Sequence, residues 1–189
     1  MYTMIQIRLH RVYYPVTTLG PGRRLGIWVQ GCKKKCPGCL SPEMQPCVGP
    51  LLTVESIVQN IPADIRPDGL TISGGEPFDQ PAGVAELIRW FTDRYTSDVL
   101  VYTGYTLAEL KARQDPATDA ILMGLAALVD GPYCKDLDLG KGLMGSENQQ
   151  VYVYRFPERY QGFSTAPRTL QAVQEPQQLI FIGIPPQKI

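Results

Sequence analysis

Three cysteines within eight residues constrain this chain more than any other feature of its sequence. Cys32, Cys36 and Cys39 lie in the stretch CKKKCPGC, directly after the mostly apolar residues 25–30. Because the gaps between them are three and two residues, the thiols can meet at one metal centre if the backbone forms a loop rather than a helix. Structural zinc sites usually take four protein ligands, and [4Fe–4S] clusters are normally held by four thiolates. A cluster held by three would leave one iron open to a substrate or cofactor, which points to catalysis.

Two other interpretations of these cysteines compete with a cluster. Cysteines are often buried and inert, but the lysines at 33–35 argue against a packed interior segment, because ammonium groups are almost never buried unpaired. A zinc loop would need a fourth ligand, and Cys47, Cys134 and His10 do not stand at a familiar pair spacing. We therefore expect an iron–sulfur cluster on the three close cysteines and a structural role for the other two.

The length and charge of the chain exclude several classes of protein. A chain of 189 residues fits one domain, so we expect a single domain over residues 1–189. The 18 basic and 18 acidic side chains give a net charge of zero, which provides no general attraction to nucleic acid or a membrane surface. An odd number of cysteines fits a reducing compartment, and no apolar stretch approaches the ~20 residues of a membrane span. We therefore expect a cytoplasmic protein with no nucleic-acid or membrane partner.

Apolar patterning predicts alternating strands and helices. Residues 1–10 alternate with period two and predict a strand at a sheet edge, and residues 25–30 predict the strand that leads into the cysteine loop. Further strands are predicted at 69–73, 98–103, 126–130, 151–154 and 179–183, with a loop from 157 to 178. Helices are predicted at 53–60, 81–95, from Thr106 and Glu109 onward, and at 115–124. These units indicate an α/β fold with a mainly parallel sheet, which places the cysteine loop at the C-terminal edge of the strands.

A glycine pair follows the strand predicted at 69–73. In the stretch SGGEP, Gly74 and Gly75 lack a Cβ atom, so a ligand can approach their backbone closely, and Glu76 is presented at the C-terminal edge of the sheet. A glycine pair alone is common turn chemistry. Its place, one strand–helix unit after the cysteines, makes it a candidate binding element.

The spacing Cys-x3-Cys-x2-Cys resembles the signature of the radical S-adenosylmethionine (SAM) enzymes, in which SAM binds the open iron. Residues 20–42 resemble one branch of that family, the activating proteins of anaerobic ribonucleotide reductase and their single-cluster relatives. Many other branches have an aromatic residue before the third cysteine, where this chain has Gly38. The resemblance implies a [4Fe–4S] cluster on Cys32, Cys36 and Cys39, SAM as a second cofactor, and a shortened, open partial (β/α) barrel.

The Gly-Gly-Glu-Pro element of radical SAM enzymes contacts the amino group of SAM. By resemblance, Gly74, Gly75 and Glu76 would bind the methionine end of SAM. Thr103 in the stretch YTGY and Asp130 in DGPY resemble elements of the activating proteins and are further candidates for cofactor binding.

One more motif extends the resemblance to about residues 18–150. Residues 145–149, GSENQ, resemble a motif that typically follows an arginine, where this chain has Met144. The tail, residues 151–189, matches none of these motifs, and its role stays open.

The resemblance implies an enzyme that reductively cleaves SAM to methionine and a 5′-deoxyadenosyl radical. The activating-protein branch implies that this radical takes hydrogen from a backbone glycine of a partner glycyl radical enzyme, such as anaerobic ribonucleotide reductase. Two alternatives remain. One is a radical SAM enzyme that modifies another peptide or a small molecule, and the other is an iron–sulfur electron-transfer module without SAM chemistry, which would leave the glycine pair unexplained.

The lysines at 33–35 allow two interpretations. They can keep the loop solvated, or they can steer an acidic reductant to the cluster, since the chain has no overall charge to do so. A flavodoxin or ferredoxin is therefore the expected electron donor.

Overall fold

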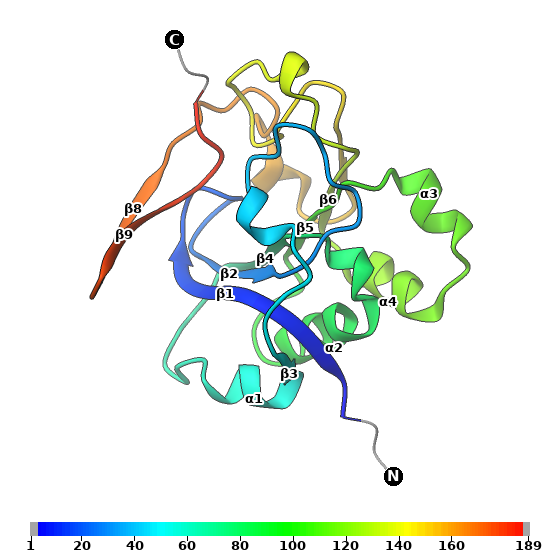
Figure 1. Cartoon of the computed structure of the whole chain (residues 1–189), viewed down its shortest axis with the longest axis vertical. Helices are drawn as coiled ribbons and strands as arrows, with labels where there is room; N and C mark the ends of the chain where they lie inside the picture. The colour runs from blue at the N-terminus through cyan, green and yellow to red at the C-terminus, as the bar shows by residue number, and fades with distance from the viewer. Residues whose placement is uncertain (1–3, 187–189) are drawn as a thin grey trace.

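The computed structural model describes residues 4–186, and a seven-stranded sheet forms its centre (Figure 1). The strand order is β3-β1-β2-β4-β5-β6-β7. The strands are β1 (Gln6–Val16), β2 (Arg24–Val29), β3 (Leu51–Thr53), β4 (Gly69–Gly74), β5 (Val99–Tyr102), β6 (Ala127–Asp130) and β7 (Gln150–Val153). β2, β4, β5 and β6 run parallel to one another, whereas β1, β3 and β7 are antiparallel to their neighbours. The predicted α/β class and the parallel central strands are confirmed.

The α-helices of the described chain cover one face of this sheet. They are α1 (Val54–Gln59), α2 (Pro81–Thr92), α3 (Leu107–Ala112) and α4 (Pro116–Gly124). Three of them follow a residue whose side chain accepts a hydrogen bond from a backbone N–H in the first turn. These residues are Thr53 before α1, Thr106 before α3 and Asp115 before α4. Each helix contributes to a single hydrophobic core with the strands, because its apolar residues recur on one side.

The opposite face of the sheet carries no α-helix among residues 4–186. Alternate residues of a strand point to opposite faces. Val29 and Val101 pack in the core beneath the helices, whereas Trp28 and Leu100 pack in two further cores that contain no residue of α1–α4. Period-two alternation thus gives each central strand two different buried environments.

The first strand is not at the edge of the sheet, so that prediction was wrong. β3 pairs with β1 through Gln6, Ile7 and Arg8 and takes the edge position. β3 has only three residues, which is too short for its patterning to predict a strand. β1 also extends past residue 10 to Val16, and residues 1–3 of the predicted strand lie outside the described residues.

The tail contains a strand that the sequence did not predict. β8 (Gln171–Glu175) lies within the predicted loop and forms an antiparallel hairpin with β9 (Gln178–Ile182), separate from the main sheet. Because β8 has the sequence QAVQE and buries only Val173, its apolar signal is weak. The predicted strand at 179–183 is confirmed as β9.

The sheet is open in its strand order. β3 and β7 form its two ends and do not pair with each other among the described residues. A barrel-like curvature, expected from the resemblance, therefore stays a prediction. In residues 4–186 no helix is both long and apolar enough to cross a membrane.

A buried ion pair ties the start of the parallel strands together. The Arg24 guanidinium donates to Asp98 Oδ1 at 3.1 Å, to Thr71 Oγ1 at 2.6 Å and to the Leu70 carbonyl oxygen at 2.7 Å. Both charged side chains are fully buried. Such a pair is costly to break because the remaining charge has no water to replace its partner.

Candidate cofactor pocket

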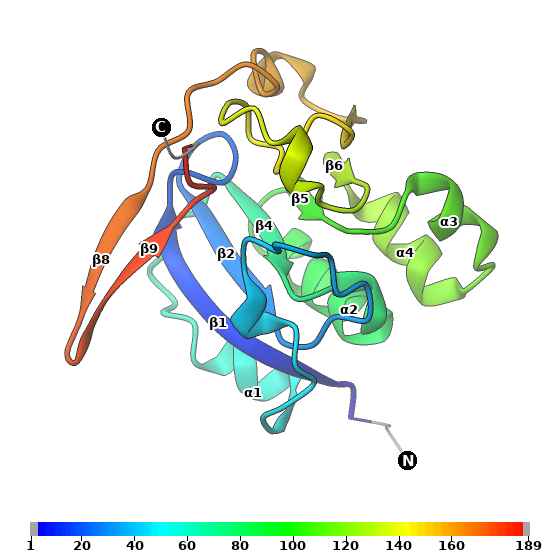
Figure 2. The ribbon, with the colours of Figure 1, turned by 45° about the horizontal axis from the view of Figure 1, so that its top comes forward.

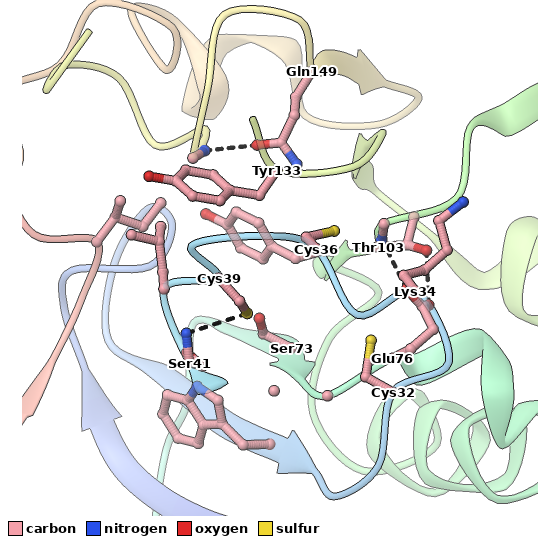
Figure 3. A pocket seen from close by; sticks show the side chains of 18 of the residues that line it. Cys32, Lys34, Cys36, Cys39, Ser41, Ser73, Glu76, Thr103, Tyr133 and Gln149 are labelled. Atoms are coloured by element: carbon pink, nitrogen blue, oxygen red, sulfur yellow. Dashed lines mark hydrogen bonds between the residues drawn. The ribbon is translucent and has the colours of Figure 1, made fainter. Parts of the chain in front are cut away.

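A pocket opens where the central parallel strands end (Figure 3). The loop after β2 contributes Cys32, Cys36 and Cys39, β4 and its end contribute Ser73, Gly74, Gly75 and Glu76, and β5 and its end contribute Tyr102, Thr103 and Gly104. The segment after β6 adds Gly131 and Tyr133, and more distant segments add Gly145, Gln149, Gly183 and Ile184. The predicted cysteines and the glycine pair therefore share one pocket at the C-terminal ends of parallel strands, where α/β proteins commonly bind ligands.

The three pocket cysteines are all half-buried. Burial raises the pKa of the Cys32 thiol above its ordinary value, and the Ser41 backbone N–H donates to Cys39 Sγ at 3.4 Å. Cys47 is exposed and Cys134 is half-buried, and neither lines the pocket. Of these five cysteines, only the three closely spaced ones line the pocket.

The donor set fits a cluster better than a single metal ion. Throughout residues 4–186, no group of three or more His, Cys, Asp or Glu side chains is close enough to hold one metal ion. A cubane cluster presents a separate iron atom to each thiolate, so its ligands stand farther apart than those of one ion. Three closely spaced thiols that line one pocket suit such a cluster.

The cysteine loop is anchored at its base. The N–H groups of Gly31 and Cys32 donate to the carbonyl oxygens of Met44 and Gln45 at 2.8 and 2.9 Å. The Lys33 N–H donates to Asp79 Oδ2 at 2.7 Å. These bonds hold the first cysteine in a set position relative to the end of β4.

Gly74 and Gly75 are packed against backbone rather than only open to a ligand. A Cβ atom on Gly75 would lie 2.2 Å from the Gly31 carbonyl oxygen, and one on Gly74 would lie 2.5 Å from the Val29 oxygen. Gly74 also has a φ of 106°, which favours glycine. The glycine pair therefore lets β4 lie directly against the segment that leads into the cysteine loop, a reason that the sequence alone did not reveal.

Glu76 is almost fully buried at the floor of the pocket. Its carboxylate accepts hydrogen bonds from Thr103 Oγ1 at 2.7 Å, from the Phe78 N–H at 2.9 Å and from the Gly104 N–H at 2.8 Å. Burial raises the pKa of Glu76 to about 7, against the opposing effect of these hydrogen bonds. Through these hydrogen bonds Glu76, which follows β4, holds the residues that follow β5 in place. It therefore positions the part of the pocket that these two strand ends form.

Thr103 and Asp130 lie in different places. Thr103 lines the pocket, beside Glu76. Asp130 is buried but does not line the pocket, and its carboxylate accepts hydrogen bonds from the Leu107 N–H at 2.5 Å and the Gln150 N–H at 3.3 Å. The position of Asp130 therefore indicates that it orders the start of α3 and β7.

Two pocket residues have surroundings that the sequence did not predict. The Tyr102 hydroxyl is buried and has no hydrogen-bond partner among the described residues, which fits a pocket that receives a polar ligand. Lys34 lies over the Tyr105 ring, 4.4 Å from its centroid, and pairs with Glu109 at 3.3 Å. The sequence pointed to the lysines at 33–35 and to the stretch YTGY, but it did not predict these contacts, because the partners come from other elements.

The chain is similar in sequence to a family and to several characterised proteins. Residues 18–152 match the family described as 4Fe-4S single cluster domain. The anaerobic ribonucleoside-triphosphate reductase-activating protein of Salmonella typhimurium is 34% identical over 160 residues, which cover 79% of this chain and 100% of that protein. The proteins of the same name from Vibrio cholerae and Escherichia coli K12 are 32% and 33% identical, covering 74% and 76% of this chain and 94% and 97% of theirs.

The match therefore covers most of this chain and almost the whole length of these relatives. It includes the cysteine loop, the glycine pair and the strand ends that line the pocket. The chain belongs to the 4Fe-4S single cluster domain family, and within it to the group of anaerobic ribonucleoside-triphosphate reductase-activating proteins.

Proposed function

We propose that the chain is a radical SAM enzyme that activates a partner glycyl radical enzyme. The observation that carries this proposal is the single pocket in which three closely spaced cysteines meet the Gly-Gly-Glu strand end. When bound, a reduced [4Fe–4S] cluster would supply the electron that cleaves SAM into methionine and a 5′-deoxyadenosyl radical. The protein would hold the reacting groups in line and keep water away.

The residues of the pocket suit these two groups. Cys32, Cys36 and Cys39 would hold the cluster and leave one iron for SAM. The backbone at Gly74 and Gly75 would receive the methionine end of SAM, with Glu76 and Thr103 fixing the adjoining strand ends. An electron-transfer module would need only the cysteines, so the buried Glu76 network favours an enzyme.

The names of the relatives support the choice of substrate. The relatives are named for the activation of anaerobic ribonucleoside-triphosphate reductase, and they align over 94–100% of their length. We therefore propose a reductase of this kind as the partner, with a backbone glycine as the hydrogen donor. A different peptide or a small molecule is the alternative, and a reducing cytoplasm suits either reaction because its thiols stay reduced.

The proposed function can be tested with the purified chain under anaerobic conditions. After reconstitution with iron and sulfide, dithionite and SAM should yield methionine and 5′-deoxyadenosine, and added reductase should acquire a glycyl radical visible by electron paramagnetic resonance. An intact cluster without any 5′-deoxyadenosine would favour the electron-transfer module. Formation of 5′-deoxyadenosine without a radical on the reductase would favour another substrate.

Replacing Glu76 by Gln should weaken SAM binding about 10- to 100-fold while iron content stays unchanged. An amide has one acceptor oxygen, so its NH2 group must face one of the N–H donors of Phe78 and Gly104, and losing a charged hydrogen bond costs about 1.5–3 kcal/mol. Anaerobic calorimetry measures the affinity. Glu86→Gln, on the exposed side of α2, is the matched control, and equal SAM affinity in both variants would remove this role of Glu76.

Exposed lysines beside the cysteines suit an acidic electron donor such as flavodoxin or ferredoxin. Lys33 and Lys35 are exposed, whereas Lys34 packs on Tyr105. The double change Lys33→Glu with Lys35→Glu should slow flavodoxin-driven SAM cleavage, because it removes the attraction that speeds association with an acidic donor. The effect should be seen at low salt, since physiological salt screens such charges over ~8 Å. Dithionite-driven cleavage should stay near wild type. Equal loss with both reductants would mean that the loop is damaged, and no loss would mean that these lysines are only solvated.

A further inference from the structure

The end of the chain covers part of the sheet face that carries no α-helix. We call residues 157–186 the C-terminal segment, which runs over this face from the side of β6 to the side of β1 (Figure 2). Tyr160 and Phe163 pack with Leu100, and Val173 and Ile182 pack with Trp28. The family match ends at residue 152, so this cover lies outside it.

The C-terminal segment also reaches the pocket. Gly183 and Ile184, which follow β9, line the pocket together with the cysteines. Across the pocket from Glu76 and Cys32, the view in Figure 3 shows Tyr133 and Gln149. The pocket is therefore built from the family-matched residues and from residues beyond them.

The buried side chain of Arg168 connects the C-terminal segment to residues 138–145. The Arg168 side chain is 1% exposed, and it forms an ion pair with Asp138 at 2.7 Å. Its guanidinium nitrogens also donate to the carbonyl oxygens of Gly142, Met144, Gly145 and Pro185, at 3.0, 2.6, 3.1 and 3.0 Å. A planar guanidinium can satisfy several acceptors at fixed angles, so it sets the spacing between the segments that it joins.

Two of the segments held by Arg168 line the pocket. Gly145 is a pocket residue, and its N–H donates to Oε1 of Gln149, another pocket residue, at 2.7 Å. Pro185 directly follows Ile184. Movement of the Arg168 side chain would therefore displace both sides of this wall, while the cysteine loop is anchored by other residues.

We propose that the C-terminal segment forms one wall of the SAM pocket and that Arg168 is the positioning residue that sets this wall. The inference rests on the proposed function, since SAM is the ligand that the wall encloses. Arg168 itself does not line the pocket. It acts through the backbone of Gly145 and Pro185.

The experiment compares Arg168→Met with Arg155→Met in the cluster-loaded protein. Arg155 is exposed, and its side chain donates one hydrogen bond, to the Met123 carbonyl oxygen at 3.0 Å. Arg168→Met should weaken SAM binding at least about tenfold at unchanged iron content, because a small misplacement of a binding wall is costly. Arg155→Met should bind SAM like the wild type. Arg168→Lys keeps the positive charge beside Asp138 but loses the planar set of N–H donors. It should therefore bind SAM with an affinity between those of the wild type and Arg168→Met.

A second readout needs no cluster. Trp28 lines the pocket, and the chain has two tryptophans, so in a Trp90→Phe background the fluorescence reports Trp28 alone. Arg168→Met should move this emission toward longer wavelength as water enters the pocket. Ile184→Ala, which shortens the wall without removing a buried charge, should also weaken SAM binding.

Several outcomes would overturn the inference. One is wild-type SAM affinity and wild-type Trp28 emission in Arg168→Met, even with a lowered unfolding temperature, because Arg168 would then stabilise the fold only. Another is loss of iron in parallel with SAM binding, which would place its effect at the cysteine loop. Normal SAM binding in Ile184→Ala would mean that the C-terminal segment does not contact SAM. If the wild-type protein itself fails to bind SAM, the proposed function is wrong as well.

Discussion

Replacing Cys36 by Ala is expected to abolish the iron–sulfur cluster. Each of Cys32, Cys36 and Cys39 would supply one of three protein ligands, and among residues 4–186 no further Cys or His side chain lines the pocket to replace a lost one. Two remaining thiolates cannot hold three corners of a cubane, so reconstituted protein should contain little iron or sulfide. Chemical analysis and the electron paramagnetic resonance signal of the reduced cluster measure the loss. Cys32→Ala and Cys39→Ala should behave alike.

Cys47→Ala and Cys134→Ala are the matched controls. Cys47 is exposed and Cys134 is half-buried, and both lie outside the pocket lining. Both variants should keep the iron content of the wild type. If either lost the cluster as completely as Cys36→Ala, the three-ligand assignment would be wrong.

Asp98→Ala should destabilise the metal-free protein by about 3–5 kcal/mol, because it leaves the buried Arg24 without its partner. Asp98 also pairs with Arg159 at 2.6 Å and accepts a hydrogen bond from the Tyr160 hydroxyl. The same change therefore loosens the C-terminal segment. Urea denaturation followed by circular dichroism gives the free energy of unfolding, and the unfolding temperature should fall by about 6–20 °C.

Asp93→Ala is the control for this change. Asp93, the residue directly after α2, pairs with Arg89 of that helix, and both side chains are more than half exposed. Exposed pairs of this kind contribute about 0.3–0.5 kcal/mol. Equal unfolding midpoints for the two variants would show that the Arg24–Asp98 pair is not what holds the strand starts together.

Most of the strands and helices, and the chemistry expected of the cysteine loop, could be predicted from the sequence alone, whereas β3 and β8 could not. Apolar alternation over short windows is a local property, so residues 25–30 and 98–103 predicted β2 and β5 within one or two residues. The cysteine spacing and the glycine pair are equally local. They were sufficient to indicate an iron–sulfur protein of the family that the comparisons show.

Which residues share a site follows from the folded structure and not from local sequence patterns. Thr103 directly follows β5 and Asp130 is the last residue of β6. Only Thr103 lines the pocket, because the Asp130 carboxylate accepts hydrogen bonds from the backbone N–H groups of Leu107 and Gln150. The steric need for Gly75 likewise depends on the Gly31 carbonyl oxygen, which is 44 positions earlier in the chain (75 minus 31). The pattern of apolar residues predicts which positions are buried and whether a segment is a strand or a helix. It does not predict which atom from a distant part of the chain will contact a given residue.

The C-terminal segment shows the same limit most clearly. Its apolar residues are sparse before β9, and β8 was predicted as loop because one buried valine makes no pattern. Arg168 would be expected at the surface from its charge, but it is buried where four carbonyl oxygens and Asp138 converge. That convergence exists only after the chain has folded across the sheet face that carries no α-helix, because the acceptors come from two segments, residues 138–145 and Pro185, that are distant in sequence.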